Sequence, residues 1–102
     1  MAGFAFHPEA LLEYADATTY YLREGSPTVA DRFLVAVEEA VASIVAAPDL
    51  WRIVDEPGIR RYVFRRFPFV IYYSWDPQQD FVTFFAIMHS SRKPGYWKAR
   101  AT

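Results

Sequence analysis

The second half of the chain contains three runs of hydrophobic residues that predict β-strands. They cover residues 59–64, 69–75 and 81–88 and are rich in Val, Ile, Phe and Tyr, which suit a pleated, half-buried surface. Pro, Asp or Gly borders the runs, where the chain can turn. Short connections favour an antiparallel meander, and we expect the alternating segment Phe4–Phe6 to add an edge strand.

The first half of the chain predicts two helices. His7, Pro8 and Glu9 open the first helix, because proline is tolerated in a first helical turn and an early acid complements the helix dipole. This helix is expected to run to Arg23. Its apolar face, read from helical spacing, consists of Leu11, Ala15, Thr18 and Leu22.

A second helix follows directly. Gly25 suits a helix C-terminus, Ser26 an N-cap and Pro27 a first helical residue. The hydrophobic repeat of this helix continues until Pro48, which ends it. The repeat consists of Ala30, Phe33, Leu34, Val37, Val41, Ile44 and Val45. Together the two helices should form an antiparallel hairpin.

The order of these elements defines the fold class. A helical hairpin between an N-terminal strand and three later strands predicts an α+β fold, in which the hairpin covers one face of an antiparallel sheet. Residues 1–102 are expected to form a single domain. The connector at residues 49–57 carries Trp51, which we expect to fill the gap between hairpin and sheet.

Composition narrows the class of protein. The hydrophobic share of 53% and the aromatic share of 19% indicate a chain that folds rather than a disordered segment. There is no cysteine, so disulfides and thiolate zinc sites are excluded. No N-terminal signal pattern or apolar run of about 20 residues is present, and we therefore expect a cytoplasmic protein without membrane partners.

The net charge of −1 conceals an asymmetry between the two halves. Residues 1–57 carry three bases and ten acids, a balance of −7, whereas residues 58–102 carry eight bases and two acids, a balance of +6. Such a split indicates a basic sheet side that faces an acidic partner. The alternative is that the two halves neutralise each other within the fold.

Several kinds of chemistry lack support in the sequence. The four glycines are scattered, so no phosphate-binding loop is predicted, and no cofactor is expected. His7 and His89 have no second ligand at metal-binding spacing, so no metal site is expected. Ser90 and Ser91 follow His89 directly, but on an extended segment adjacent side chains point to opposite faces, which excludes a shared proton.

The main group of polar residues with possible catalytic roles follows the last predicted strand. His89 could exchange protons and Arg92 could hold an anion, as cleavage of an RNA phosphodiester would require, with Tyr96 completing the candidate catalytic residues. In the structural alternative, His89 is satisfied by nearby backbone and Arg92 pairs with a carboxylate of the hairpin. Lys93 and Trp97 are candidates for partner contact.

A second basic group precedes the middle strand. Arg60, Arg61, Arg65 and Arg66 fall within seven residues, which exceeds what solubility needs. We expect them to contact a partner together with Arg92. Strand alternation places Arg61 and Arg65 on one face and Arg60 on the other.

Four motifs recur along the second half of the chain: Gly58–Arg61, Phe67–Tyr73, Val82–Ile87, and His89-x-x-Arg92-x-Pro94-x-x-Trp97. With the helical hairpin, this combined pattern resembles the RelE/ParE superfamily of bacterial toxins, and the resemblance covers nearly the whole chain. It implies the same α+β fold, with an acidic, apolar antitoxin segment bound to the hairpin and the sheet edge.

The branches of this superfamily differ in their targets. RelE-like members are ribosome-dependent mRNA endonucleases, whereas ParE-like members inhibit DNA gyrase. Phe69 stands where the nuclease branch often carries an arginine, and the sequence pI near 6.1 suits ribosome entry poorly. The resemblance therefore favours a ParE-like toxin. An mRNA endonuclease that uses His89, Arg92 and Tyr96 is the alternative, and an inactive member that only binds antitoxin is a third.

The C-terminal segment leaves two interpretations open. Residues 92–100 contain four bases, no acids, Tyr96 and Trp97, a combination that favours contact with an acidic target. In the other interpretation, Trp97 folds back to cap the hydrophobic core.

Overall fold

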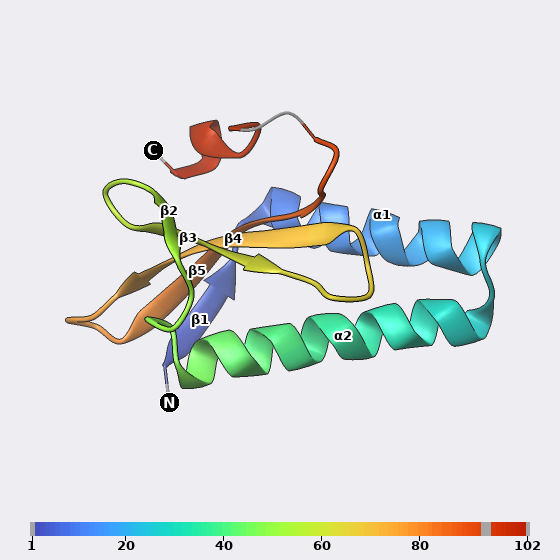
Figure 1. Cartoon of the computed structure of the whole chain (residues 1–102), viewed down its shortest axis with the longest axis horizontal. Helices are drawn as coiled ribbons and strands as arrows, with labels where there is room; N and C mark the ends of the chain where they lie inside the picture. Colours follow the sequence, from blue (N-terminus) through green and yellow to red (C-terminus); the bar gives the residue numbers. More distant parts are fainter. Residues whose placement is uncertain (1, 93–94, 102) are drawn as a thin grey trace.

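The computed structural model describes residues 2–92 and 95–101. Two helices and five strands follow one another along the chain, and a short 3-10 helix ends it (Figure 1). In chain order they are β1 (Gly3–Phe6), α1 (Pro8–Glu24), α2 (Pro27–Ala46), β2 (Ile53–Asp55), β3 (Ile59–Val63), β4 (Phe69–Asp76), β5 (Phe81–His89) and η1 (Lys98–Ala101).

The strands form one sheet in the order β1-β5-β4-β3-β2. The predicted meander of β3, β4 and β5 is confirmed, because both pairs are antiparallel. The expectation of a purely antiparallel sheet is wrong: β1 lies parallel to β5, with Gly3 opposite Phe81 and Phe6 opposite Phe84. The direction of β1 depends on how the intervening helical hairpin packs, which local sequence does not specify. The connector also contributes a short strand, β2, which pairs with β3.

The junction between the helices forms as predicted. The Ser26 side chain accepts a hydrogen bond from the Val29 amide at 3.2 Å, and Pro27 is the first residue of α2. The Gly25 amide donates to the carbonyl of Tyr21 at the end of α1. These bonds satisfy backbone groups that a helix end leaves without partners.

Helix α1 turns a different face inward from the one predicted. Ala10 and Ala17 are buried, whereas Leu11 and Leu22 are each about half exposed. The small alanines let the helix approach the sheet closely, and Tyr21, on the same side of the helix, packs its ring 5.1 Å from the ring of Phe33. The predicted stripe of Leu11, Ala15, Thr18 and Leu22 is therefore not the buried face.

The main core lies between the hairpin and the sheet. Phe33, Val37 and Ile44 of α2 are buried as their spacing predicted, and they pack with Tyr73 and Phe84 of the sheet. The Tyr73 hydroxyl donates to the Pro48 carbonyl at 2.8 Å, and burial raises the pKa of Tyr73 to about 12.

Trp51 lies between the hairpin and the sheet, as the sequence analysis predicted. Its ring is partly buried against the main core, with its centroid 5.3 Å from that of Tyr62. The connector therefore contributes an aromatic contact between hairpin and sheet, as expected.

A second cluster covers the other face of the sheet. Trp97 is only 3% exposed and packs with Ile59, Val70 and Met88, and its ring stacks on Tyr72 at 4.8 Å. Figure 1 shows the C-terminal segment lying on the side of the sheet away from α2. The interpretation in which Trp97 caps the core is confirmed, so this side chain is not free to contact a partner.

Replacing Trp97 by alanine tests the energetic weight of this second cluster. Loss of a buried aromatic costs about 3–5 kcal/mol, so Trp97→Ala should lower the thermal midpoint by roughly 10 °C or more. Leu12→Ala is the control, because Leu12 is 63% exposed and its truncation should leave the midpoint almost unchanged. Circular dichroism melts measure both. Equal melting of the two variants would contradict the assignment.

Tyr73 makes the free energy of unfolding decrease at alkaline pH. Its pKa is about 12 in the folded chain and about 10 in an unfolded one, so the folded state holds the phenol proton more tightly. The stability from Tyr73 is therefore complete below about pH 10 and is lost as the pH rises toward 12. Urea unfolding from pH 9 to 12 should show a smaller loss for Tyr73→Phe than for the unaltered protein. Parallel pH profiles would exclude this contribution.

Candidate partner-binding site

A groove of about 660 Å³ lies between α1 and the ends of β4 and β5. Two of the sequence-predicted residues, His89 and Arg92, line it opposite the hairpin. Its wall on α1 carries acidic and aromatic side chains, and its opposite wall carries aromatic and basic ones. Among the lining residues are Glu13, Asp16 and Tyr20 on the helix and Phe69, His89 and Arg92 on the other side.

His89 ends β5 and is held by its neighbours. Its Nδ1 accepts the Ser91 amide at 3.1 Å and lies 2.7 Å from the Ser91 hydroxyl. The ring also packs edge-on against Phe69 at 5.4 Å. The expectation that no nearby serine shares a proton with His89 is therefore wrong, because residues 90 and 91 lie in a turn that brings Ser91 back to the ring.

This Ser91–His89 contact is one half of a nucleophilic arrangement. Both contacts are made by the same ring nitrogen, Nδ1, to the amide and the hydroxyl of Ser91. Within residues 2–92 and 95–101, no carboxylate hydrogen-bonds to the other ring nitrogen. The structure thus bonds one ring nitrogen of His89 to nearby backbone, which agrees in part with the structural interpretation of this residue.

Arg92 and Tyr96 are brought together. The Arg92 guanidinium lies 5.0 Å from the centre of the Tyr96 ring, and Arg100 lies 5.2 Å from the same ring. Tyr96 is therefore flanked by two cations, a favourable arrangement for an aromatic ring. The predicted ion pair of Arg92 with the hairpin is wrong, since Arg100 makes that ion pair instead.

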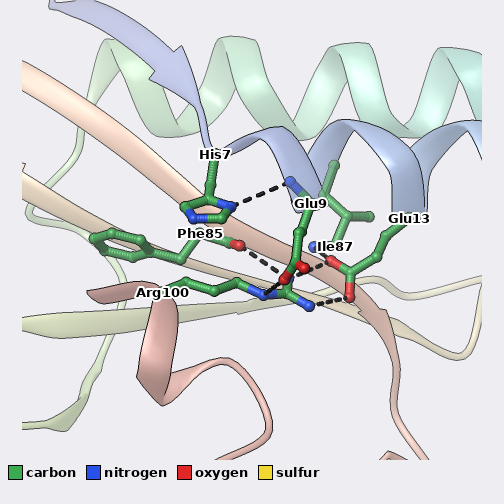
Figure 2. Close-up of polar contacts among 6 residues, drawn as sticks. All are labelled: His7, Glu9, Glu13, Phe85, Ile87 and Arg100. Carbon is green, nitrogen blue, oxygen red and sulfur yellow. Dashed lines mark hydrogen bonds and ion pairs between the residues drawn. The ribbon is translucent and has the colours of Figure 1, made fainter. Parts of the chain in front are cut away.

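Arg100 joins the C-terminal segment to α1 (Figure 2). Its Nη1 and Nη2 donate to the two carboxylate oxygens of Glu13 at 2.8 and 3.0 Å, and its Nε lies 2.9 Å from a carboxylate oxygen of Glu9. Its Nη1 also donates to the Phe85 carbonyl at 3.1 Å. Hydrogen bonding to Glu13 raises the pKa of Arg100 above its usual range.

Sequence reasoning missed both members of this pair. Glu13 and Arg100 are 87 positions apart, so no local spacing connects them. One signal was available for Glu13: it lies between the buried Ala10 and Ala17 on the inward side of α1. The contact also supports the alternative that the acidic and basic halves neutralise each other in part. Lys98 adds to this with Asp55 at 3.5 Å.

The other predicted partner-binding residues occupy different environments. Arg60 turns inward, where its Nη1 donates to the carbonyls of Asp49 and Trp51 at 3.1 and 2.6 Å, so it holds the connector in place. The rest of the arginine cluster, and Arg92, are exposed, but Arg65 and Arg66 follow β3 rather than belonging to it. Lys93 lies outside the described residues.

Two further features were looked for in the described part of the chain, a cluster of metal ligands and a membrane-spanning helix. Nowhere in residues 2–92 and 95–101 do three or more His, Asp or Glu side chains gather closely enough to hold a metal ion. Neither helix in these residues has the length and apolar character needed to span a bilayer.

Comparison with known protein families assigns the chain to one of them. The family described as ParE toxin of type II toxin-antitoxin system, parDE, matches residues 4–94. The chain belongs to the ParE toxin family. It is thus a toxin of the type II toxin-antitoxin class, and the resemblance to the RelE/ParE superfamily is confirmed. A search of curated proteins finds no match for this ParE-family toxin.

Solved structures share the fold of this toxin. The chromosomal ParDE toxin-antitoxin system of P. aeruginosa aligns with a TM-score of 0.72 at 19% identity, over 87% of this chain and 96% of that chain. The isolated E. coli RelE toxin aligns with a TM-score of 0.64 at 15% identity, over 97% and 95%. A doubly substituted E. coli RelE in the free state gives 0.65 at 14% identity, over 99% and 95%.

Proposed function

We propose that this ParE-family toxin acts by binding DNA gyrase and is neutralised by a cognate antitoxin, in the cytoplasm. The family match supports gyrase as the target, because ParE-like members are the gyrase-inhibiting branch of the superfamily. The exposed cations Arg61, Arg65, Arg66 and Arg92 offer a surface for an acidic protein.

The observation that carries this proposal is the state of the candidate catalytic residues. The His89 Nδ1 is bonded to the amide and the hydroxyl of Ser91, and the Tyr96 ring lies between the guanidinium groups of Arg92 and Arg100. General acid-base catalysis needs a proton donor and an acceptor that can both reach the reacting atoms. In these contacts, His89 holds the turn and Tyr96 holds the C-terminal segment. This structural use of both side chains favours a binding role for the protein over a catalytic one.

Ribosome-dependent mRNA cleavage is the second candidate function. The short separation of Arg92 from Tyr96, 5.0 Å to the ring centre, favours it, because a guanidinium beside a phenol can hold a phosphate near a proton donor.

The groove is the proposed site for the antitoxin. Tyr20 is 59% exposed on its helical wall, and Arg92 on the other wall can attract an acidic segment. An antitoxin segment that folds on binding could cover both walls of the groove, with an interface of roughly 1,200 Å² or more.

Gyrase inhibition should depend on the exposed arginines. Purified toxin is expected to inhibit DNA supercoiling by gyrase, and the triple variant Arg61→Glu, Arg65→Glu and Arg66→Glu should need about tenfold more protein or more for equal inhibition. Arg32→Glu is the matched control, because Arg32 is an exposed arginine on α2.

The same preparations can decide between the functions. Cleavage of mRNA in programmed ribosomes, abolished by His89→Ala, would replace gyrase inhibition with the endonuclease alternative. Failure of the induced chain to arrest growth would favour an inactive member that only binds antitoxin.

Antitoxin binding should depend on the groove. Tyr20→Ala is expected to raise the Kd for the product of a neighbouring antitoxin gene by about tenfold or more, because exposed tyrosines at an interface centre carry much of the binding free energy. Val63→Ala removes an equally exposed hydrophobic side chain from β3 and should leave the Kd unchanged. Isothermal titration calorimetry measures both. Unchanged binding by Tyr20→Ala would place the antitoxin elsewhere.

A further inference from the structure

The side of α1 that faces the groove carries a row of three acids. Glu9, Glu13 and Asp16 follow one another at helical spacing, which places them along one side of the helix. Glu13 and Asp16 line the groove. The row therefore runs along the α1 wall of the proposed antitoxin site.

The protein itself shows what the first two acids of the row bind. The Arg100 guanidinium lies 2.9 Å from a carboxylate oxygen of Glu9 and donates to both oxygens of Glu13 (Figure 2). Asp16 is the next acid along α1, and it is exposed. Within residues 2–92 and 95–101, no Arg or Lys lies close enough to Asp16 to form an ion pair. Asp16 thus presents a negative charge that the described chain does not compensate.

The opposite wall presents a positive charge of the same kind. Arg92 is exposed, and its guanidinium lies 5.0 Å from the centre of the Tyr96 ring. No carboxylate in the described part of the chain forms an ion pair with Arg92. Tyr20 and Phe69 add an aromatic ring to each wall. The groove is therefore bipolar, with an acid on one wall and a base on the other.

We propose that the antitoxin segment held in this groove carries a lysine or arginine that pairs with Asp16 and an acid that pairs with Arg92. This inference rests on the proposed role of the groove as the antitoxin site. It replaces a uniformly acidic segment with one that has opposite charges on its two sides. Asp16 then determines which antitoxin binds.

The cost of covering Asp16 favours a basic partner. An occupant of the groove removes water from the Asp16 carboxylate, which is unfavourable unless a cation takes the place of the water. Arg100 meets the same requirement for Glu13, whose side chain is only 19% exposed. An acid placed against Asp16 would instead add repulsion between like charges.

The two opposite charges also fix the orientation of the segment. A segment that was turned around would bring its acid against Asp16 and its base against Arg92, and both contacts would be repulsive. An antitoxin with the wrong charge at either place is rejected for the same reason. The bipolar groove thus supplies specificity in addition to attraction.

Reversing the charge of Asp16 gives opposite results for the two kinds of segment. If a base faces Asp16, Asp16→Arg should raise the Kd for the product of the neighbouring antitoxin gene by about tenfold or more. If the segment is uniformly acidic, the same variant should lower the Kd. Isothermal titration calorimetry measures the change, and a lowered or unchanged Kd would overturn the proposal.

Glu56→Arg is the matched control. It makes the same change of charge at an exposed residue in the turn between β2 and β3, outside the groove, and should leave the Kd almost unchanged. An equal rise in the Kd of this control would be an effect of net charge alone and would also overturn the proposal.

Asp16→Asn tests the ion pair without introducing repulsion. The Kd should rise by less than with Asp16→Arg. It should also depend less on salt concentration than the Kd of the unaltered protein, because screening weakens an ion pair. The same salt dependence in both proteins would contradict a base at Asp16.

Tyr20→Ala separates failure of this inference from failure of the proposed site. If Tyr20→Ala weakens binding and Asp16→Arg does not, the antitoxin lies in the groove but carries no base against Asp16. If neither variant changes the Kd, the antitoxin binds elsewhere and both proposals are wrong.

Discussion

The ion pair between Arg100 and Glu13 connects three parts of the chain: the C-terminal segment, α1 and the edge of β5. It ties the C-terminal segment to α1 and bonds to the Phe85 carbonyl, while the other bond of Glu13 holds the Ile87 amide. A partly buried pair of this kind is tolerable only when its remaining donors and acceptors are satisfied. Here Glu9 and the backbone of β5 satisfy them, so the ion pair and the sheet edge stabilise each other.

The same segment explains why both faces of the central strands are covered. The hairpin packs on one face of the sheet, and Trp97 packs on the other. In a chain of 102 residues, burying two faces raises the apolar area removed from water, which small domains need. Residues that resemble a catalytic group in sequence, such as Tyr96, therefore lie within a segment that also has a structural task.

Much of the fold could be predicted from local patterns. The meander followed from runs of β-branched and aromatic residues bordered by turn residues, and α2 followed from a period-3.6 repeat. The junction at Ser26 followed from capping chemistry. Each of these depends on residues close together in the chain. The prediction for α1 chose the wrong face. Its leucines outweigh its alanines in hydrophobicity, but close packing against the sheet favoured Ala10 and Ala17.

The candidate site could be predicted only in part. The sequence by itself determined that the polar chemistry follows β5 and that the chain has the motifs of its family, since both are properties of contiguous residues. Only the tertiary structure decided that Arg100, rather than Arg92, pairs with Glu13 and that Trp97 is buried against the sheet. Those contacts join residues as distant as Glu13 and Arg100, and the parallel placement of β1 depends in the same way on packing across the whole chain.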